Sequence, residues 1–81
     1  MKTIYVPIEE IYVPVKHRQN LNPEKVETVA DAFMETGHMT PILVRHDGKR
    51  YVLVKGINRL EACKALGEEL VAAFKVQAAQ H

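Results

Sequence analysis

The spacing of apolar and polar residues predicts a strand, an irregular arm, a helix, a hairpin, a second helix and a last strand, in that order. Thr3 to Val6 is rich in β-branched and aromatic residues and predicts the first strand, which Pro7 ends or places at a sheet edge. A short turn and an extended connection follow. The tetrapeptide IYVP occurs at residues 4–7 and 11–14, and two copies are too few for a repeat architecture.

The segment NLNPEKVETVADAFMETGH carries the clearest helix signal. Asn22 suits the N-cap, Pro23 the first helical position and Gly37 the left-handed residue after the end. Apolar residues recur at spacings of three and four, which predicts one face directed at the core. The residues of that face are Val26, Val29, Ala30, Phe33 and Met34.

A hairpin is predicted in PILVRHDGKRYVLVKG, where two apolar runs flank Asp47-Gly48. This dipeptide favours the positive φ angles of a tight turn between two strands. The hairpin is the strongest strand signal in the chain.

The stretch from Asn58 to Leu66 has helical spacing, and a last strand is expected at about Leu70 to Val76. Asn58 can serve as the N-cap of the helix, with Glu61 completing a capping box, and Gly67 can end it. The element order predicts a small α+β domain in which two main helices pack on a mixed sheet.

The chain length of 81 residues fits one domain, residues 1–81, with a core of about residues 3–76. A net charge of +1 provides no general attraction to nucleic acid, so DNA binding would need a local patch or a partner. Cys63 is the single cysteine and cannot form an internal disulfide. No apolar run approaches the roughly 20 residues of a membrane span, and the early acidic residues argue against a signal peptide. We therefore expect a cytoplasmic location.

Candidate chemistry is concentrated in VLVKGINRLEACKALG, residues 52–67, because core packing does not ask for a glycine, an asparagine and an arginine at a junction of strand and helix. A strand that ends in glycine directly before a helix exposes backbone N–H groups whose dipoles point outward. Gly56 would let a phosphate approach the backbone, and Arg59 would add a bidentate contact. Lys55 adds positive field before the turn.

The same junction has an ordinary structural explanation. Glycine is common before helices, and Arg59 can be a solvated side chain whose charge Glu61 balances. A structural metal is not predicted, because the histidines lack the spacing of metal ligands and no second cysteine completes a zinc site.

The string GINRLEACKALG resembles the GxxR helix-start motif of the ParB/sulfiredoxin superfamily, in which glycine and arginine lie at the head of a helix that cradles nucleotide phosphates. The segment VPIEEIYVPVKHRQNLNPEKVETVADAF resembles the arm and first helix of both branches, and TPILVRHDGKRYVLVKG resembles the ParB hairpin. The similarity extends from Val6 to Val76, with its segments in the same order. It implies a ParB/sulfiredoxin-like fold.

The resemblance also implies a nucleotide pocket between the N-terminal regions of the two helices. Gly56 and Arg59 match the phosphate-binding glycine and arginine of the superfamily. Lys25 and Thr28 match a lysine and a hydroxyl residue that reach ATP phosphates in sulfiredoxins, although polar residues on that helix face need no ligand. Arg18 falls close to the arginine of the ParB arm. The expected phosphate-binding residues are Gly56, Ile57, Asn58, Arg59, Lys25, Thr28 and Arg18.

Two departures from the superfamily bear on catalysis. Sulfiredoxins carry a reactive cysteine where this chain has Ile57, so reduction of sulfinic acid is not expected. Members that phosphorylate free serine carry histidine where Asn58 stands, and asparagine cannot act as a titrating acid or base. Cys63 is expected to be a small buried hydrophobe.

Three hypotheses follow for function. The first is a stand-alone ParB-like module that binds a nucleoside di- or triphosphate (CTP, ATP or ADP), with or without Mg²⁺, and so regulates association with DNA or a protein partner. The second is a phosphotransferase or nucleotide hydrolase using Glu9 or Glu10 as a base. The third is a degenerate module that has kept the fold and lost the ligand, acts by protein association only, and has Arg59 paired with a local acid such as Glu61.

The expected assembly follows from the segments that the sequence lacks. ParB partition proteins carry a helix-turn-helix domain and a dimerisation domain after this module, and neither is present in the sequence, so an isolated module is expected. A chain of this size could form a homodimer to bury residual apolar surface.

Overall fold

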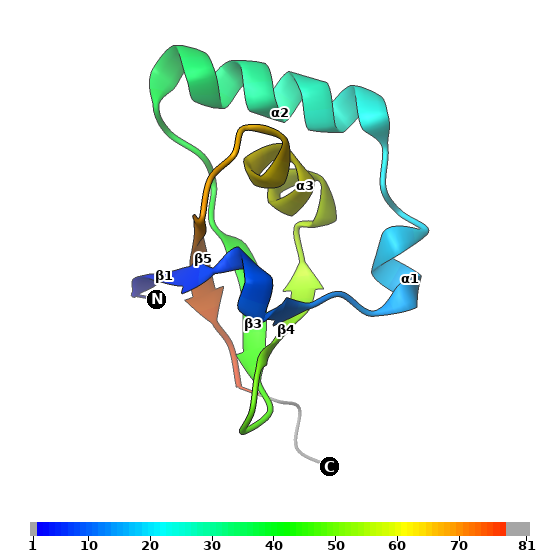
Figure 1. The fold of residues 1–81 in the computed structure, drawn as a ribbon, viewed down its shortest axis with the longest axis vertical. Coiled ribbons are helices and arrows are strands. Elements are labelled where there is room, and N and C mark those ends of the chain that lie inside the picture. The colour runs from blue at the N-terminus through cyan, green and yellow to red at the C-terminus, as the bar shows by residue number, and fades with distance from the viewer. Residues whose placement is uncertain (1, 78–81) are drawn as a thin grey trace.

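The structure is a computed structural model that describes residues 2–77. Figure 1 shows the arrangement of its elements. They are β1 (Thr3–Pro7), the 3₁₀ turn η1 (Ile8–Glu10), β2 (Ile11–Tyr12), α1 (Val15–Arg18), α2 (Pro23–Thr36), β3 (Ile42–His46), β4 (Tyr51–Lys55), α3 (Ile57–Ala65) and β5 (Leu70–Lys75). The predicted helices, hairpin and terminal strands are all present.

The five strands form one mixed sheet in the order β1-β5-β3-β4-β2. The β1–β5 and β3–β4 pairs are antiparallel, and the β3–β5 and β2–β4 pairs are parallel. β1 and β2 lie at opposite edges although only η1 separates them. In a flat sheet the two edge strands would lie four strand spacings of about 4.8 Å apart. The four residue steps from Pro7 to Ile11 can span only roughly 14 Å, which is less than that distance, so the sheet has to curl.

The core lies on the concave side of the curled sheet and is closed by α3. Alternate residues of the strands point inward, as the two-residue period of a strand requires. The core cluster takes Val6, Ile42, Val44, Leu53, Val71 and Ala73 from the strands and Ile57, Leu60 and Cys63 from α3. Val52 is also buried but lies outside this cluster. α3 therefore belongs to the core, whereas α2 lies across its outer side (Figure 1).

The apolar face of α2 packs less deeply than its spacing predicts. No residue of this helix is buried, and Val26, Val29, Ala30 and Phe33 are only half-buried. Met34 is 72% exposed, so its expected place in the core is wrong. At about 100° per residue, Met34 lies at the margin of the stripe that faces α3.

Among residues 2–77, no helix is long and apolar enough to cross a membrane.

The predicted ends of the helices are mostly correct. The Asn22 side chain accepts hydrogen bonds from the backbone N–H groups of Glu24 and Lys25, and Gly37 follows α2 with φ 71°. After α3, the N–H groups of Gly67 and Glu68 bond back to the helix in a Schellman arrangement. Both helices therefore have capped C-terminal ends, and the N-terminus of α2 is capped as well.

The arm between β1 and α2 is more regular than the sequence indicates. It contains η1, the two-residue strand β2 and the four-residue helix α1. Ile11 and Tyr12 pair with Tyr51 and Val52 of β4, so the second IYVP copy begins a strand. Elements this short lack a readable period, which is why sequence spacing cannot find them.

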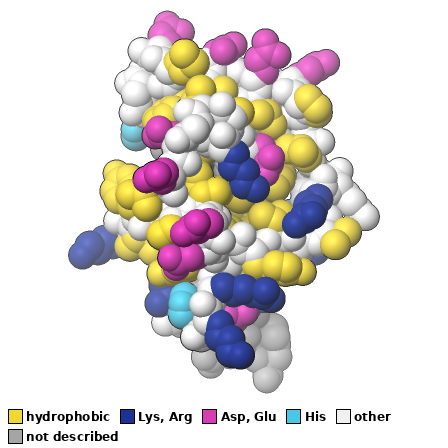
Figure 2. Space-filling model, in the orientation of Figure 1, with side chains coloured by type: hydrophobic (Ala, Val, Ile, Leu, Met, Phe, Trp, Pro, Cys, Tyr) yellow, Lys and Arg dark blue, Asp and Glu magenta, His cyan; other side chains and the backbone are white. Residues whose placement is uncertain are grey.

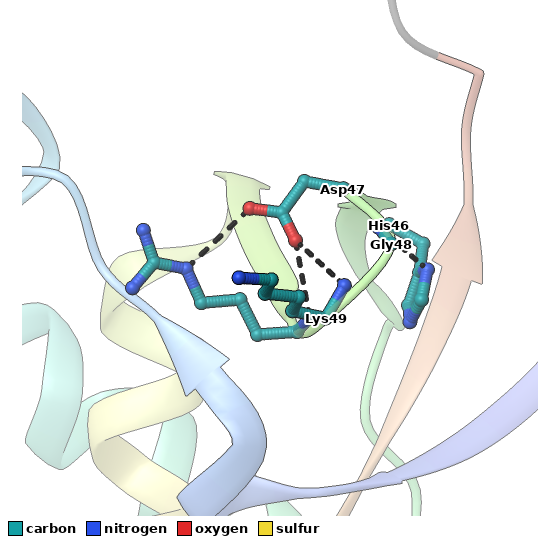
Figure 3. Close-up of polar contacts among 5 residues, drawn as sticks. His46, Asp47, Gly48 and Lys49 are labelled. Atoms are coloured by element: carbon teal, nitrogen blue, oxygen red, sulfur yellow. Dashed lines mark hydrogen bonds and ion pairs between the residues drawn. The ribbon is translucent and has the colours of Figure 1, made fainter.

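The β3–β4 turn is organised by Asp47 (Figure 3). One carboxylate oxygen accepts hydrogen bonds from the N–H groups of Lys49 and Arg50, both at 3.1 Å. Gly48 takes the positive φ of 95° that the turn requires. The hydrogen bonds from Arg50 and Lys49 stabilise the charged carboxylate and lower the pKa of Asp47.

We predict that Asp47 titrates below its usual value of 3.8. Because its folded-state pKa is lowered, its contribution to stability is present above 3.8 and is lost as the pH falls through the folded pKa. An NMR pH titration of the Asp47 carboxyl carbon measures this directly. A midpoint at or above 3.8 would show that the turn does not hold the carboxylate.

Candidate functional site

The junction between β4 and α3 brings backbone donors to the surface. Gly56 precedes the helix with φ 113°. The first hydrogen bond of α3 runs from the Leu60 N–H to the Gly56 carbonyl at 2.9 Å. The N–H groups of residues 57–59 therefore have no acceptor within the helix and point out of its start. The predicted set of outward donors is present.

Gly56 is also fixed by packing. A Cβ atom at this position would lie 2.8 Å from Ile42 Cγ2 and 3.2 Å from Arg59 Nη2. Ile42 is fully buried at the start of β3, so it cannot move away. The junction therefore requires glycine both for its positive φ and for the close approach of β3.

Asn58 joins the heads of the two long helices instead of capping α3. The N-cap of α3 is Gly56 and has no side-chain cap, so the expected capping role of Asn58 is wrong. Its Oδ1 instead accepts a hydrogen bond of 2.8 Å from the backbone N–H of Asn22. Asn22 caps α2, so this bond holds the two N-terminal ends side by side. Sequence reasoning could not find it because the partners are 36 residues apart.

The Arg59 side chain reaches the segment just before β3, where its guanidinium Nη1 donates hydrogen bonds to the carbonyl oxygens of Thr40 and Pro41. Partial burial lowers the pKa of Arg59 because it disfavours the charged form. An anion beside the guanidinium would offset that penalty. Glu61 pairs with Lys64 at 3.0 Å, so it is not the acid that balances Arg59.

A surface groove of about 750 Å³ runs along these residues. Small-molecule sites commonly measure roughly 300–1,000 Å³. Its lining residues are His17, Asn20, Lys25, Thr28, Val29, Val54, Lys55, Gly56, Ile57, Asn58 and Arg59. Among these described residues, three are cations and none carries a carboxylate, so the groove favours an anion.

The structure brings six of the seven expected phosphate-binding residues into this groove. Lys25 and Thr28 face it from α2. The Thr28 hydroxyl donates to the Glu24 carbonyl at 3.0 Å, so it could donate to a phosphate only after redirecting its proton. Arg18 is exposed on α1 and is not among the lining residues. Its role stays a prediction.

Sequence reasoning missed His17, Asn20, Val29 and Val54 as parts of the groove wall, and it assigned Val29 only to the core face of its helix. Val54 could have been found, because a residue next to inward-pointing Leu53 must point outward. His17 and Asn20 reach the groove through the position of α1, which no local pattern reveals.

The positions weighed for catalysis are divided between the groove and other parts of the fold. Ile57 is a buried core residue that also lines the groove. Cys63 is buried as expected, and burial together with Glu68 raises its pKa. Glu9 lines a different hollow beside Lys64, and neither Glu9 nor Glu10 lines the groove. Among residues 2–77, no three His, Cys, Asp or Glu side chains gather as a metal site would require.

The whole sequence, residues 1–81, matches the ParB N-terminal domain. The chain belongs to this family. The probable chromosome-partitioning protein ParB of Campylobacter jejuni is 34% identical over 61 residues, which are 75% of this chain and 22% of that protein. The chain thus spans about a fifth of the length of this ParB relative.

Two solved structures, a sulfiredoxin and a ParB protein, share the fold of this chain. Sulfiredoxin from Arabidopsis thaliana has a TM-score of 0.84 at 23% identity, covering 96% of this chain and 88% of that chain. C-terminally truncated ParB from Caulobacter crescentus, complexed with CTP-γ-S, has a TM-score of 0.79 at 25% identity, covering 99% of this chain and 47% of that chain. The ParB/sulfiredoxin-like α+β fold expected from the sequence is confirmed.

We predict that Gly56→Ala lowers the free energy of unfolding by about 3 kcal/mol, because the new methyl group meets buried Ile42 and the backbone is strained. Gly67→Ala is the matched control. Gly67 has φ 76°, and a methyl group there would meet no atom within 4 Å, so only the left-handed conformation is penalised. That penalty is about 1–2 kcal/mol. Urea unfolding measures both values. Equal losses of stability in the two variants would contradict the close approach of Gly56 to Ile42.

Asn58→Ala is expected to destabilise the protein by about 1 kcal/mol, because it removes the acceptor of the Asn22 N–H. Amide hydrogen exchange at Asn22 should quicken more than exchange in β5. Asn58→Asp keeps an acceptor at this position and should preserve the protection of Asn22. If both variants lose it equally, the hydrogen bond does not hold the helix heads together.

Proposed function

We propose that this chain is a ParB-like module that binds the phosphates of a nucleoside di- or triphosphate in the groove at the head of α3. The observation that supports it most strongly is a groove whose described lining includes Lys25, Lys55 and Arg59, with outward backbone donors and no carboxylate. Phosphates are favoured at such a helix start because dipole and N–H groups act together.

The N-terminal ends of α2 and α3 both contribute to the proposed phosphate site. The N–H groups at the start of α3 face the phosphates, and Lys25 and Thr28 approach from α2. The hydrogen bond between Asn58 and Asn22 fixes their separation, so the donors are in place before a ligand arrives. Such preorganisation reduces the entropy lost on binding.

The nucleotide is proposed to be CTP, ATP or ADP. The ParB structure with CTP-γ-S supports a cytidine nucleotide in this family. Val29 and Val54 offer apolar wall for a base or ribose, and Asn20 offers hydrogen bonds. A Mg²⁺ ion would be held by phosphates and water, because the described groove lining supplies no carboxylate.

The proposed consequence of binding is regulation of association with DNA or a protein partner. A bound nucleotide would place negative charge among three cations and tie α1, α2 and α3 together. Such a ligand can shift an equilibrium between partner-binding states only through its different affinity for them. The ParB relative named for chromosome partitioning supports DNA as the context.

A phosphotransferase is less well supported. Catalysis in the groove would need a base within hydrogen-bond reach of the acceptor. Glu9 lies in a hollow with Lys64, Glu68 and Glu69, away from the groove lining. Asn58 is engaged with Asn22 and has no titrating group.

We predict saturable amide shifts at residues 56–60 when the protein is titrated with one of CTP, ATP, ADP or GTP, with and without Mg²⁺. Arg59→Ala and Lys25→Gln should each weaken binding by about tenfold, because a charge-assisted contact contributes about 1.5–3 kcal/mol. Two-dimensional NMR titration gives affinity and location together.

Lys64→Gln is the matched control, because Lys64 lies on α3 but outside the groove lining and pairs with Glu61. It should leave nucleotide affinity unchanged. Unaltered affinity in Arg59→Ala, or equal losses in all three variants, would overturn the proposed groove.

A further inference from the structure

Charge is strongly segregated in this nearly neutral chain. Residues 11–23 and 37–60 contain one acid, Asp47, and the cations Lys16, Arg18, Arg45, Lys49, Arg50, Lys55 and Arg59. The exposed residues of α2 include the acids Glu24, Glu27, Asp31 and Glu35. Figure 2 shows acidic side chains over α2 and basic ones toward the hairpin end. A net charge of +1 therefore conceals a basic surface.

The outer side of β2, β4 and β3 carries the centre of this surface. Tyr12 pairs with Val52, and Val52 pairs with Arg45, so the three side chains form a row across the strands. Leu53 points inward to the core, and the row therefore lies on the convex side of the sheet. The turn adds Lys49 and Arg50 at the end of the row. We call Tyr12, Arg45, Lys49 and Arg50 the basic face.

A stacked pair lies within the basic face. The Arg50 guanidinium carbon is 4.0 Å from the centre of the Tyr12 ring. Tyr12 is 41% exposed and the Arg50 side chain 52% exposed, so part of this cation–π pair meets solvent. Unpaired bases stack on aromatic rings and on arginine planes alike. The pair has the chemistry of a base platform.

The acid in this region cancels only part of the positive charge. Asp47 contacts Arg50 at 3.5 Å and accepts two backbone hydrogen bonds from the turn. Its carboxylate is thus engaged in holding the turn and orienting Arg50. Arg45 and Lys49 have no ion pair among the described residues, and they are available to phosphates.

We propose that the basic face binds single-stranded nucleic acid, with phosphates at Arg45 and Lys49 and a base on the Arg50–Tyr12 stack. The inference rests on the association with DNA in the proposed function and adds a surface distinct from the nucleotide groove. None of the four residues lines that groove. A positive patch with an exposed planar stack suits a strand whose bases are unpaired.

The test is fluorescence anisotropy of a labelled single strand of about 20 nucleotides, titrated with the protein between about 50 and about 200 mM salt. Saturable binding that weakens with salt is expected. Arg45→Gln combined with Lys49→Gln should weaken it about tenfold and flatten its salt dependence. Tyr12→Ser should weaken it by about tenfold through loss of stacking. Circular dichroism melting checks that each variant folds.

Lys64→Gln removes one charge outside the basic face and should change strand affinity by less than about twofold. The inference is overturned if no strand binds, if Lys64→Gln weakens binding as much as the basic-face variants do, or if duplex DNA binds as tightly as the single strand. Self-association at low salt without strand binding would also overturn it, and would indicate that the basic face contacts α2 of a second copy.

The nucleotide titration separates the two proposals. If residues 56–60 respond to nucleotide but no single strand binds, the proposal for the groove stands and the proposal for the basic face fails. If a single strand binds, also in the Arg59→Ala variant, but no nucleotide causes a response, the proposal for the basic face stands and the proposal for the groove fails.

Discussion

The close approach of Gly56 to Ile42 fixes where α3 begins, and the candidate groove depends on that position. A side chain at Gly56 would overlap the buried Ile42, so only glycine lets β4 pass into α3 against the start of β3. Arg59 strengthens the contact by bonding the carbonyl groups of Thr40 and Pro41. The same residues that expose the first N–H groups of α3 therefore also anchor it to the core, which joins stability and the proposed phosphate binding at one junction.

A second constraint connects that junction to the rest of the groove. The hydrogen bond from the Asn22 N–H to Asn58 Oδ1 sets the two helix heads side by side. It brings Lys25 and Thr28 opposite Gly56 although they lie about 30 residues earlier in the chain. α2 has no buried residue, so this bond and the half-buried contact with α3 position it. A ligand that contacts the N-terminal ends of both α2 and α3 would stabilise α2, which is weakly packed.

Local patterns in the sequence predicted what depends on local chemistry. The caps of α2, the Asp47 turn and the glycine at the junction were found because turn residues and periodic spacing mark them. The bond of Asn58, the place of α1 in the groove and the exposed Met34 could not be found, because each depends on how distant elements pack. The basic face was hidden for the same reason, since Tyr12 and Arg45 meet only through strand register.

A crystal structure of the protein grown with CTP and Mg²⁺ would show whether phosphates bind at the head of α3. We expect phosphate oxygens within hydrogen-bond distance of the backbone N–H groups of residues 57–59, with Lys25 and Arg59 beside them. A structure in which the phosphates lie elsewhere, with the groove lined only by water, would contradict it.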